Sequence, residues 1–192
     1  MREQDSYGNR FAESSGGLFF PGRELPTEQD LNRIFGVDCR VLTERGFIEM
    51  GVLKKGQRLP FLNPPKRHIY QHKLADGTKI EVVSQAIYFV DMVVGDHALM
   101  ASFVPENSEA TEHYHIYGIR EHYTSIAGRA HLRLEEGVID LGDNNRRYTV
   151  EERTIHRFST NSSPAFTSLV MENAGRVSRD KWHILTDSRK VL

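Results

Sequence analysis

The stretch from His113 to Gly128 reads HYHIYGIREHYTSIAG and combines two closely spaced histidines with a carboxylate and a glycine. Successive side chains of a β-strand point to opposite faces, so His113 and His115 would share one face while Tyr114 faces the other. Two imidazoles presented in this way can chelate one metal ion through their neutral nitrogens. Glu121 follows across a short turn, and a neighbouring strand would bring its carboxylate back beside both histidines. The stretch therefore predicts three ligands of one metal site.

A fourth candidate ligand is His156, which follows a turn-rich segment at 142–145 and a β-rich approach at 148–150. A ligand from a separate strand would leave coordination positions open for water or substrate. Each residue alone has a plainer interpretation, because same-face histidines often serve packing, a lone glutamate is usually solvated and a lone loop histidine is usually structural. Together and in this order they predict a site made of His113, His115, Glu121 and His156.

The surrounding sequence has the pattern of a sandwich or barrel of short strands. Strand-like runs recur with Gly, Asn, Asp and Pro between them, and a closed barrel also hides its strand edges. The tight-turn sequence Ala75-Asp76-Gly77 predicts a hairpin between two of these runs. The expected strands are 47–52, 67–74, 78–83, 86–94, 98–104, 112–115, 122–126, 130–134, 147–150 and 166–171.

The length of 192 residues fits one domain with additional segments at its ends. Residues 1–26 contain Gly and Pro without a clear period, which predicts an irregular N-terminal arm. Thr27 can then cap a short helix that Gly36 ends. We expect a barrel domain over 27–176, led by this helix, and a C-terminal tail over 177–192 that packs back onto the barrel.

The composition excludes several classes of protein. Apolar residues make up 39% of the chain, enough for a core, and 25 basic residues face 26 acidic ones. There is no basic excess for a nucleic-acid backbone or an anionic membrane. Cys39 is the single cysteine, which excludes an intrachain disulfide and a thiolate metal cage. Residues 1–20 lack the apolar core of a signal peptide, and the apolar run 86–94 is too short to span a bilayer. We expect a cytoplasmic protein that binds neither nucleic acid nor membrane.

The two windows resemble the two sequence motifs of the cupin superfamily. The first cupin motif has the form HxH, a few residues, E, six residues, G, and His113 to Gly128 matches it with a slightly longer gap before Glu121. The second has the form G, five residues, P-x-G, two residues, H, three residues, N. Residues 142–161 read GDNNRRYTVEERTIHRFSTN, in which His156 stands at the ligand position but Glu-Glu-Arg replaces the P-x-G turn.

The resemblance implies an all-β, cupin-like double-stranded β-helix (jelly-roll) barrel. It also implies one divalent metal ion, Zn, Fe, Mn or Ni, held by His113, His115, Glu121 and His156. Cupins are commonly dimeric, so a homodimer is expected, and the arm 1–26 could reach a neighbouring subunit. A cupin fold does not fix a reaction, because many chemistries and some non-catalytic roles use it.

Three functions stay open on the sequence. Residues 120–123 and 128–130 are similar to a segment of cupin-type phosphomannose isomerases, with Tyr123 in place of a tryptophan. This favours an isomerase or epimerase of a small polar molecule such as a sugar or sugar phosphate, and predicts a polar pocket with basic residues. An iron dioxygenase predicts a more apolar pocket, and a non-catalytic cupin that binds a small ligand predicts a closed site or a filled barrel. The general base is not singled out; Tyr or His residues that face the cavity are candidates.

Overall fold

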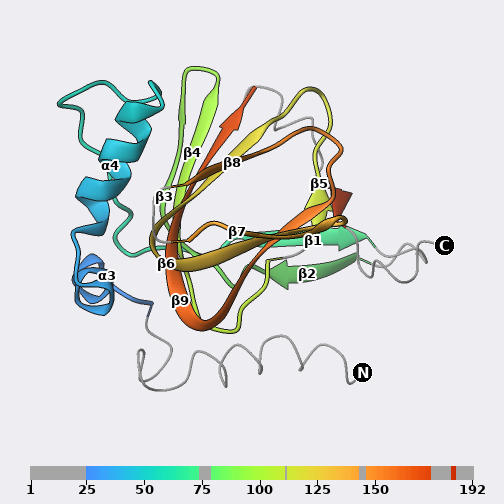
Figure 1. Ribbon diagram of the computed structural model, residues 1–192, viewed down its shortest axis with the longest axis horizontal. Helices are drawn as coiled ribbons and strands as arrows, with labels where there is room; N and C mark the ends of the chain where they lie inside the picture. The colour runs from blue at the N-terminus through green and yellow to red at the C-terminus, as the bar shows by residue number, and fades with distance from the viewer. Residues whose placement is uncertain (1–24, 74–78, 111, 143–145, 174–182, 185–192) are drawn as a thin grey trace.

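The computed structural model describes residues 25–73, 79–110, 112–142, 146–173 and 183–184 (Figure 1). Two helices come first, α3 at Glu28–Phe35 and α4 at Cys39–Glu49. The strands are β1 Ile69–Lys73, β2 Lys79–Val83, β3 Ile87–Val94, β4 His97–Val104, β5 His113–Tyr114, β6 Glu121–Leu134, β7 Gly137–Asp140, β8 Arg147–Val150, β9 His156–Glu172 and β10 His183–Ile184.

Helix α3 confirms the predicted start and end of a short helix. The Thr27 side chain accepts the Asp30 N–H at 3.2 Å, and the Asp30 carboxylate accepts the Thr27 N–H at 2.9 Å, which makes a capping box. Gly36 then ends the helix with φ of 67°, in the left-handed region that favours glycine.

The predicted strand at 47–52 is wrong, because this segment contains the end of helix α4. The Asp38 carboxylate caps the helix by accepting the Val41 N–H at 2.9 Å. The buried residues Cys39, Thr43 and Phe47 recur every four positions, as on one face of a helix. This helical period lies mostly before the segment 47–52, where the apolar residues alone suggest the alternation of a strand. Neither described helix has the length and apolar character needed to cross a membrane.

The strands form an antiparallel barrel, which confirms the all-β jelly-roll prediction. The main sheet has the order β10-β5-β9-β4-β3, and β6 pairs with β7, β8 and β9. Strands β1 and β2 form the predicted hairpin ladder, whose turn lies outside the described residues. The separately predicted strands 122–126 and 130–134 are one continuous strand, β6, and 166–171 is only the second half of β9. Strand β7 was not expected.

Helices α3 and α4 cover the outer face of the sheet, beside β3 and β4 in Figure 1. Strand β4 is therefore buried on both faces: Leu99 and Phe103 pack with the helices, while Met100 and Val104 belong to the clusters inside the barrel. This explains why β4 has a nearly continuous apolar run instead of an alternating one.

The long pair β6–β9 bends sharply, and the bend positions the two ends of the pair. Glu121 lies opposite Met171 at one end, and Leu134 lies opposite His156 at the other. Two register shifts interrupt the pairing between these ends, on either side of Gly128, which has φ of 72°. Such bulges bend a strand and increase its twist, so both strands curl around the barrel (Figure 1).

The predictions for the N-terminal arm, the homodimer and the cytoplasmic location remain predictions. Residues 1–24 lie outside the described part of the chain, as do 174–182 and 185–192 of the tail. Where the tail is described, at 183–184, it pairs with β5.

Gly128 allows a test of the bend. A Cβ atom there would lie 2.3 Å from the Pro164 carbonyl oxygen and 3.0 Å from the Phe35 ring, while a Cβ at Gly95, which has φ of 61°, meets nothing within 4 Å. Gly95→Ala should cost about 1 kcal/mol of stability from the backbone strain. Gly128→Ala should cost about 1–3 kcal/mol more, because Pro164 must move. Urea unfolding of both variants measures this difference; equal costs would contradict the close approach.

Candidate metal centre

Strand β5 and the residue that follows it present the two histidines of the first motif to the barrel interior. His113 and His115 are 4% and 3% exposed, while Tyr114 between them is only half-buried, which confirms the predicted alternation. His113 pairs directly with His156 on β9, and their ring centroids are 4.4 Å apart. The strand pairing itself therefore brings the second motif to the first.

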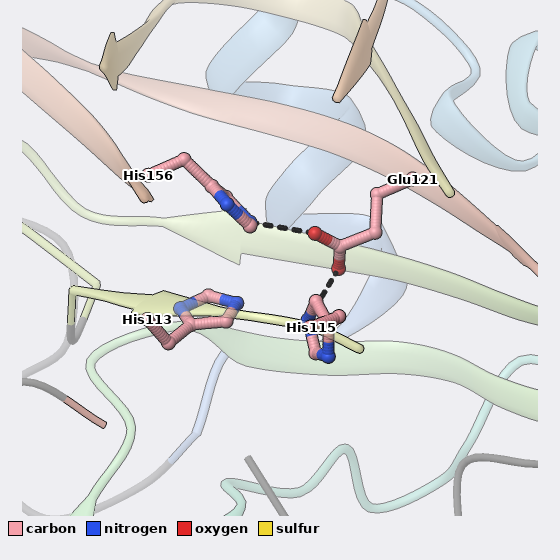
Figure 2. Close-up of side chains that lie close together, drawn as sticks. All are labelled: His113, His115, Glu121 and His156. Carbon is pink, nitrogen blue, oxygen red and sulfur yellow. Dashed lines mark ion pairs between the residues drawn. The ribbon is translucent and has the colours of Figure 1, made fainter. Parts of the chain in front are cut away.

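Glu121 reaches the three histidines from the opposite end of the β6–β9 pair. Its Oε2 lies 2.6 Å from His156 Nε2, and its Oε1 lies 3.3 Å from His115 Nε2 (Figure 2). Potential ligand atoms of all four predicted residues lie within 4.8 Å of one another, and all four side chains are buried. The structure thus brings together the whole predicted set.

The second motif forms its turn without the expected Pro-x-Gly. Arg153 adopts φ of 65°, in the region where glycine would be favoured, and its N–H donates to the His115 carbonyl at 2.7 Å. The Glu152 carboxylate accepts the Gly118 N–H at 2.5 Å. Backbone contacts with the first motif therefore hold the turn that leads into His156.

The carboxylate of Glu121 is charged despite complete burial. Burial alone would raise its pKa, but the imidazoles of His115 and His156 outweigh that effect and hold the pKa below its usual range. A buried charge of this kind needs a compensating positive charge.

The orientation of His156 suits a metal ion. Its Nδ1 lies 2.8 Å from the Thr154 carbonyl, so Nδ1 carries a proton and Nε2 points toward the carboxylate of Glu121. At 2.6 Å from Glu121 Oε2, this nitrogen needs a proton of its own or a cation beside it. Neither His156 Nε2 nor Glu121 Oε1 makes a hydrogen bond of good geometry with any described residue. The residues therefore fit a divalent ion, and three imidazoles with one carboxylate suit Zn, Fe, Mn or Ni.

Among the other described histidines, His122 and His68 have partners outside this site. His122 points to the opposite face, as its place after Glu121 predicts, where its ring nitrogens lie 2.9 Å from Thr149 Oγ1 and 2.9 Å from Glu172. His68 Nε2 lies 3.1 Å from Asp91 Oδ2, and burial lowers the pKa of this imidazole, so the contact is a hydrogen bond of a neutral ring.

A cavity of about 70 Å³ lies inside the barrel beside the metal residues. His113 and Tyr123 form part of its wall, and most of the rest is apolar. Among the described residues that line it, none is Lys or Arg. The described lining residues are Ser84, Gln85, Ala86, Tyr88, Met100, Ser102, Val104, Glu109, Ala110, His113, Tyr123, Phe158, Thr167 and Leu169.

Tyr123 joins the cavity to the metal residues, a role that the sequence analysis did not assign. Its hydroxyl donates to Glu121 Oε2 at 3.4 Å, longer than an ordinary O–H···O bond, and its ring stacks on Phe158 with centroids 5.7 Å apart. The sequence could have predicted this position of Tyr123, because residues two apart on a strand share a face and Glu121 is already expected to face the interior.

Comparison with known proteins gives matches among solved structures alone. No protein-family model matches the chain, and no curated protein matches it. A cupin 2 conserved barrel domain protein from Rhodopseudomonas palustris matches with a TM-score of 0.39 and 12% identity over 55% of this chain and 71% of that one. A cupin protein from Bacteroides fragilis matches with 0.39 and 17% over 43% and 70%.

The DMSP lyase DddQ from Ruegeria pomeroyi DSS-3 matches with a TM-score of 0.37 and 17% identity over 56% of this chain, which spans less than half, 47%, of the lyase. TM-scores below 0.5 say nothing about the activity of this chain. The fold follows instead from the strand order, the antiparallel register and the convergence of both motifs. The chain therefore has the cupin-type jelly-roll fold that its motifs predict, with His113, His115, Glu121 and His156 gathered inside the barrel.

Proposed function

We propose that this protein is a divalent-metal enzyme that transfers a proton within a small oxygen-bearing substrate, as isomerases and epimerases do. The observation that supports it is the direct adjacency of three elements: the buried three-histidine, one-glutamate cluster, the hydroxyl of Tyr123 and the cavity that His113 and Tyr123 border. His113, His115, Glu121 and His156 would hold a divalent ion, which would polarise a substrate carbonyl or carboxylate oxygen and so favour removal of a proton from the neighbouring carbon.

Tyr123 is the candidate acid–base residue. Tyrosine is among the side chains that act in general acid–base catalysis, and such a group must lie within hydrogen-bond reach of the proton that it moves. The phenol borders the cavity, and its packing against Phe158 and the edge of His156 fixes the direction of the ring. A substrate in the cavity would replace Glu121 as the hydrogen-bond partner of this hydroxyl.

The walls of the cavity favour an uncharged or singly charged substrate. A phosphate group usually meets Arg, Lys or a helix N-terminus, and the described lining residues include neither Lys nor Arg. This weighs against the phosphorylated sugars among the substrates considered above, and leaves short hydroxylated or carbonyl compounds.

A second candidate function is an iron-dependent dioxygenase. The observation that favours it is the apolar character of the lining, to which Met100, Val104, Phe158 and Leu169 contribute. Such a pocket suits a substrate that approaches a metal ion together with dioxygen. Metal identity and oxygen consumption separate the two functions.

Metal binding is the first prediction of this proposal. The protein purified without added metal should hold close to one divalent ion per chain by elemental analysis. Glu121→Gln keeps the shape but removes the charge that balances the ion, so the metal content should fall at least tenfold at equal metal concentration. Glu135→Gln, in the exposed turn after β6, is the matched control and should keep the metal. Equal metal content in both variants would contradict the site.

Tyr123→Phe tests the chemistry separately from metal binding. The variant keeps the stacking on Phe158 and should bind the metal as the wild type does. Exchange of carbon-bound hydrogen with D₂O, followed by NMR over a panel of short hydroxy ketones and aldoses, should slow by about 10²–10⁴-fold. Undiminished exchange in the variant would remove Tyr123 from the mechanism. Oxygen consumption by the iron-loaded protein, with no exchange, would favour the dioxygenase instead.

A further inference from the structure

The same cavity contains a pair of hydroxyl groups that the proposed chemistry does not use. Ser102 on β4 and Thr167 on β9 lie opposite each other in register, with Oγ and Oγ1 3.2 Å apart. They are 9% and 5% exposed and line the cavity together with His113 and Tyr123. The hydroxyl pair and His113 of the metal residues therefore border one cavity.

The register of the strands places the hydroxyl pair at a distance from the metal residues. Glu121 lies opposite Met171, and Thr167 lies four residues before Met171 on the same strand. At about 3.3 Å per residue, this separates the two levels by at most about 13 Å, with Tyr123 between them. One ligand several atoms long can therefore contact the metal residues at its head and the hydroxyl pair at its tail.

The hydrogen-bond inventory of the pair leaves capacity for a ligand. Each hydroxyl has one donor and two acceptor positions, and the contact between Ser102 and Thr167 uses one of the two donors. If Ser102 donates in this contact, the Thr167 donor can reach the Ser102 carbonyl only at 3.4 Å, longer than an ordinary O–H···O bond; if Thr167 donates, the Ser102 donor is left over. An oxygen atom of a ligand would be a better partner.

The charges of the described lining residues disfavour an anionic tail. Glu109 is the charged residue among the described lining, and its carboxylate already pairs with Arg133 at 3.5 Å and Arg157 at 3.2 Å. A phosphate or carboxylate placed against Ser102 and Thr167 would lose its hydration without gaining a cation.

We infer that Ser102 and Thr167 form a subsite for the uncharged, oxygen-bearing tail of the substrate. The head, a carboxylate or carbonyl, lies at the metal residues, so this part rests on the proposed function. The substrate class is a short hydroxy acid or hydroxy ketone with its hydroxyl at the far end. A methyl tail is disfavoured because it would leave a hydroxyl donor poorly paired inside an apolar wall.

Three acids with the same head test the subsite: 4-hydroxybutanoate, pentanoate and succinate, which end in a hydroxyl, a methyl and a carboxylate. Their dissociation constants are measured by calorimetry on the zinc-loaded protein. The wild type should bind 4-hydroxybutanoate about fivefold more tightly than pentanoate, and succinate most weakly. Thr167→Val, which replaces the hydroxyl by a methyl of similar size, should remove the preference for the hydroxyl. Ser102→Ala is the second variant, with the same expected result.

Thr124→Val is the matched control, because Thr124 is a buried threonine on the opposite face of β6 and should leave the preference unchanged. Equal affinities in the wild type, a preference that survives in both subsite variants, tight succinate binding, or no binding of any acid would overturn the subsite. Zinc content is measured on every sample. Zinc bound without a tail preference overturns the subsite alone, whereas a tail preference without zinc overturns the proposed function alone.

Discussion

The metal residues meet because the β6–β9 pair bends back on itself. Glu121 and His156 belong to opposite ends of this pair, and a straight ladder would hold them far apart. The bulges beside Gly128 turn both strands, and the carbonyl of Pro164 approaches the glycine too closely for any side chain to fit. The glycine of the first motif thus acts on the chemistry from a distance, since it contacts no ligand and yet sets where two of them lie.

The positions of the Glu121 carboxylate and of the cavity beside it both follow from the alternation of side chains along β6. Residues of β6 alternate, so Glu121 and Tyr123 both face the interior and the phenol comes to lie between the carboxylate and the cavity. The inner face of β4 adds a hydroxyl at Ser102, while its outer face packs under the helices. One double-sided strand thereby supports the core and contributes to the pocket.

Much of this could be predicted from local spacing. The same-face placement of His113 and His115 follows from the strand period, and the helix after Thr27 follows from its capping residues. Helix α4 was missed because a six-residue window around Phe47 contains too little of its period, which begins at Cys39. β6 was read as two strands because Gly128 has the signature of a break, whereas tertiary pairing with β9 carries the strand through it. The walls of the cavity could not be predicted, since they come from strands whose closure depends on that bend.

The contacts behind Glu121 have a further consequence. On the outer surface His122 is clamped between Thr149 and Glu172, and Arg120 pairs with Glu151 at 2.8 Å. Sliding β6 by one position would turn His122 inward and expel the carboxylate, breaking each of these exterior contacts at once. These exterior polar contacts therefore favour the native register of β6. Each gives little energy by itself, but a barrel with β6 shifted by one residue, in which Glu121 would face water, loses all of them.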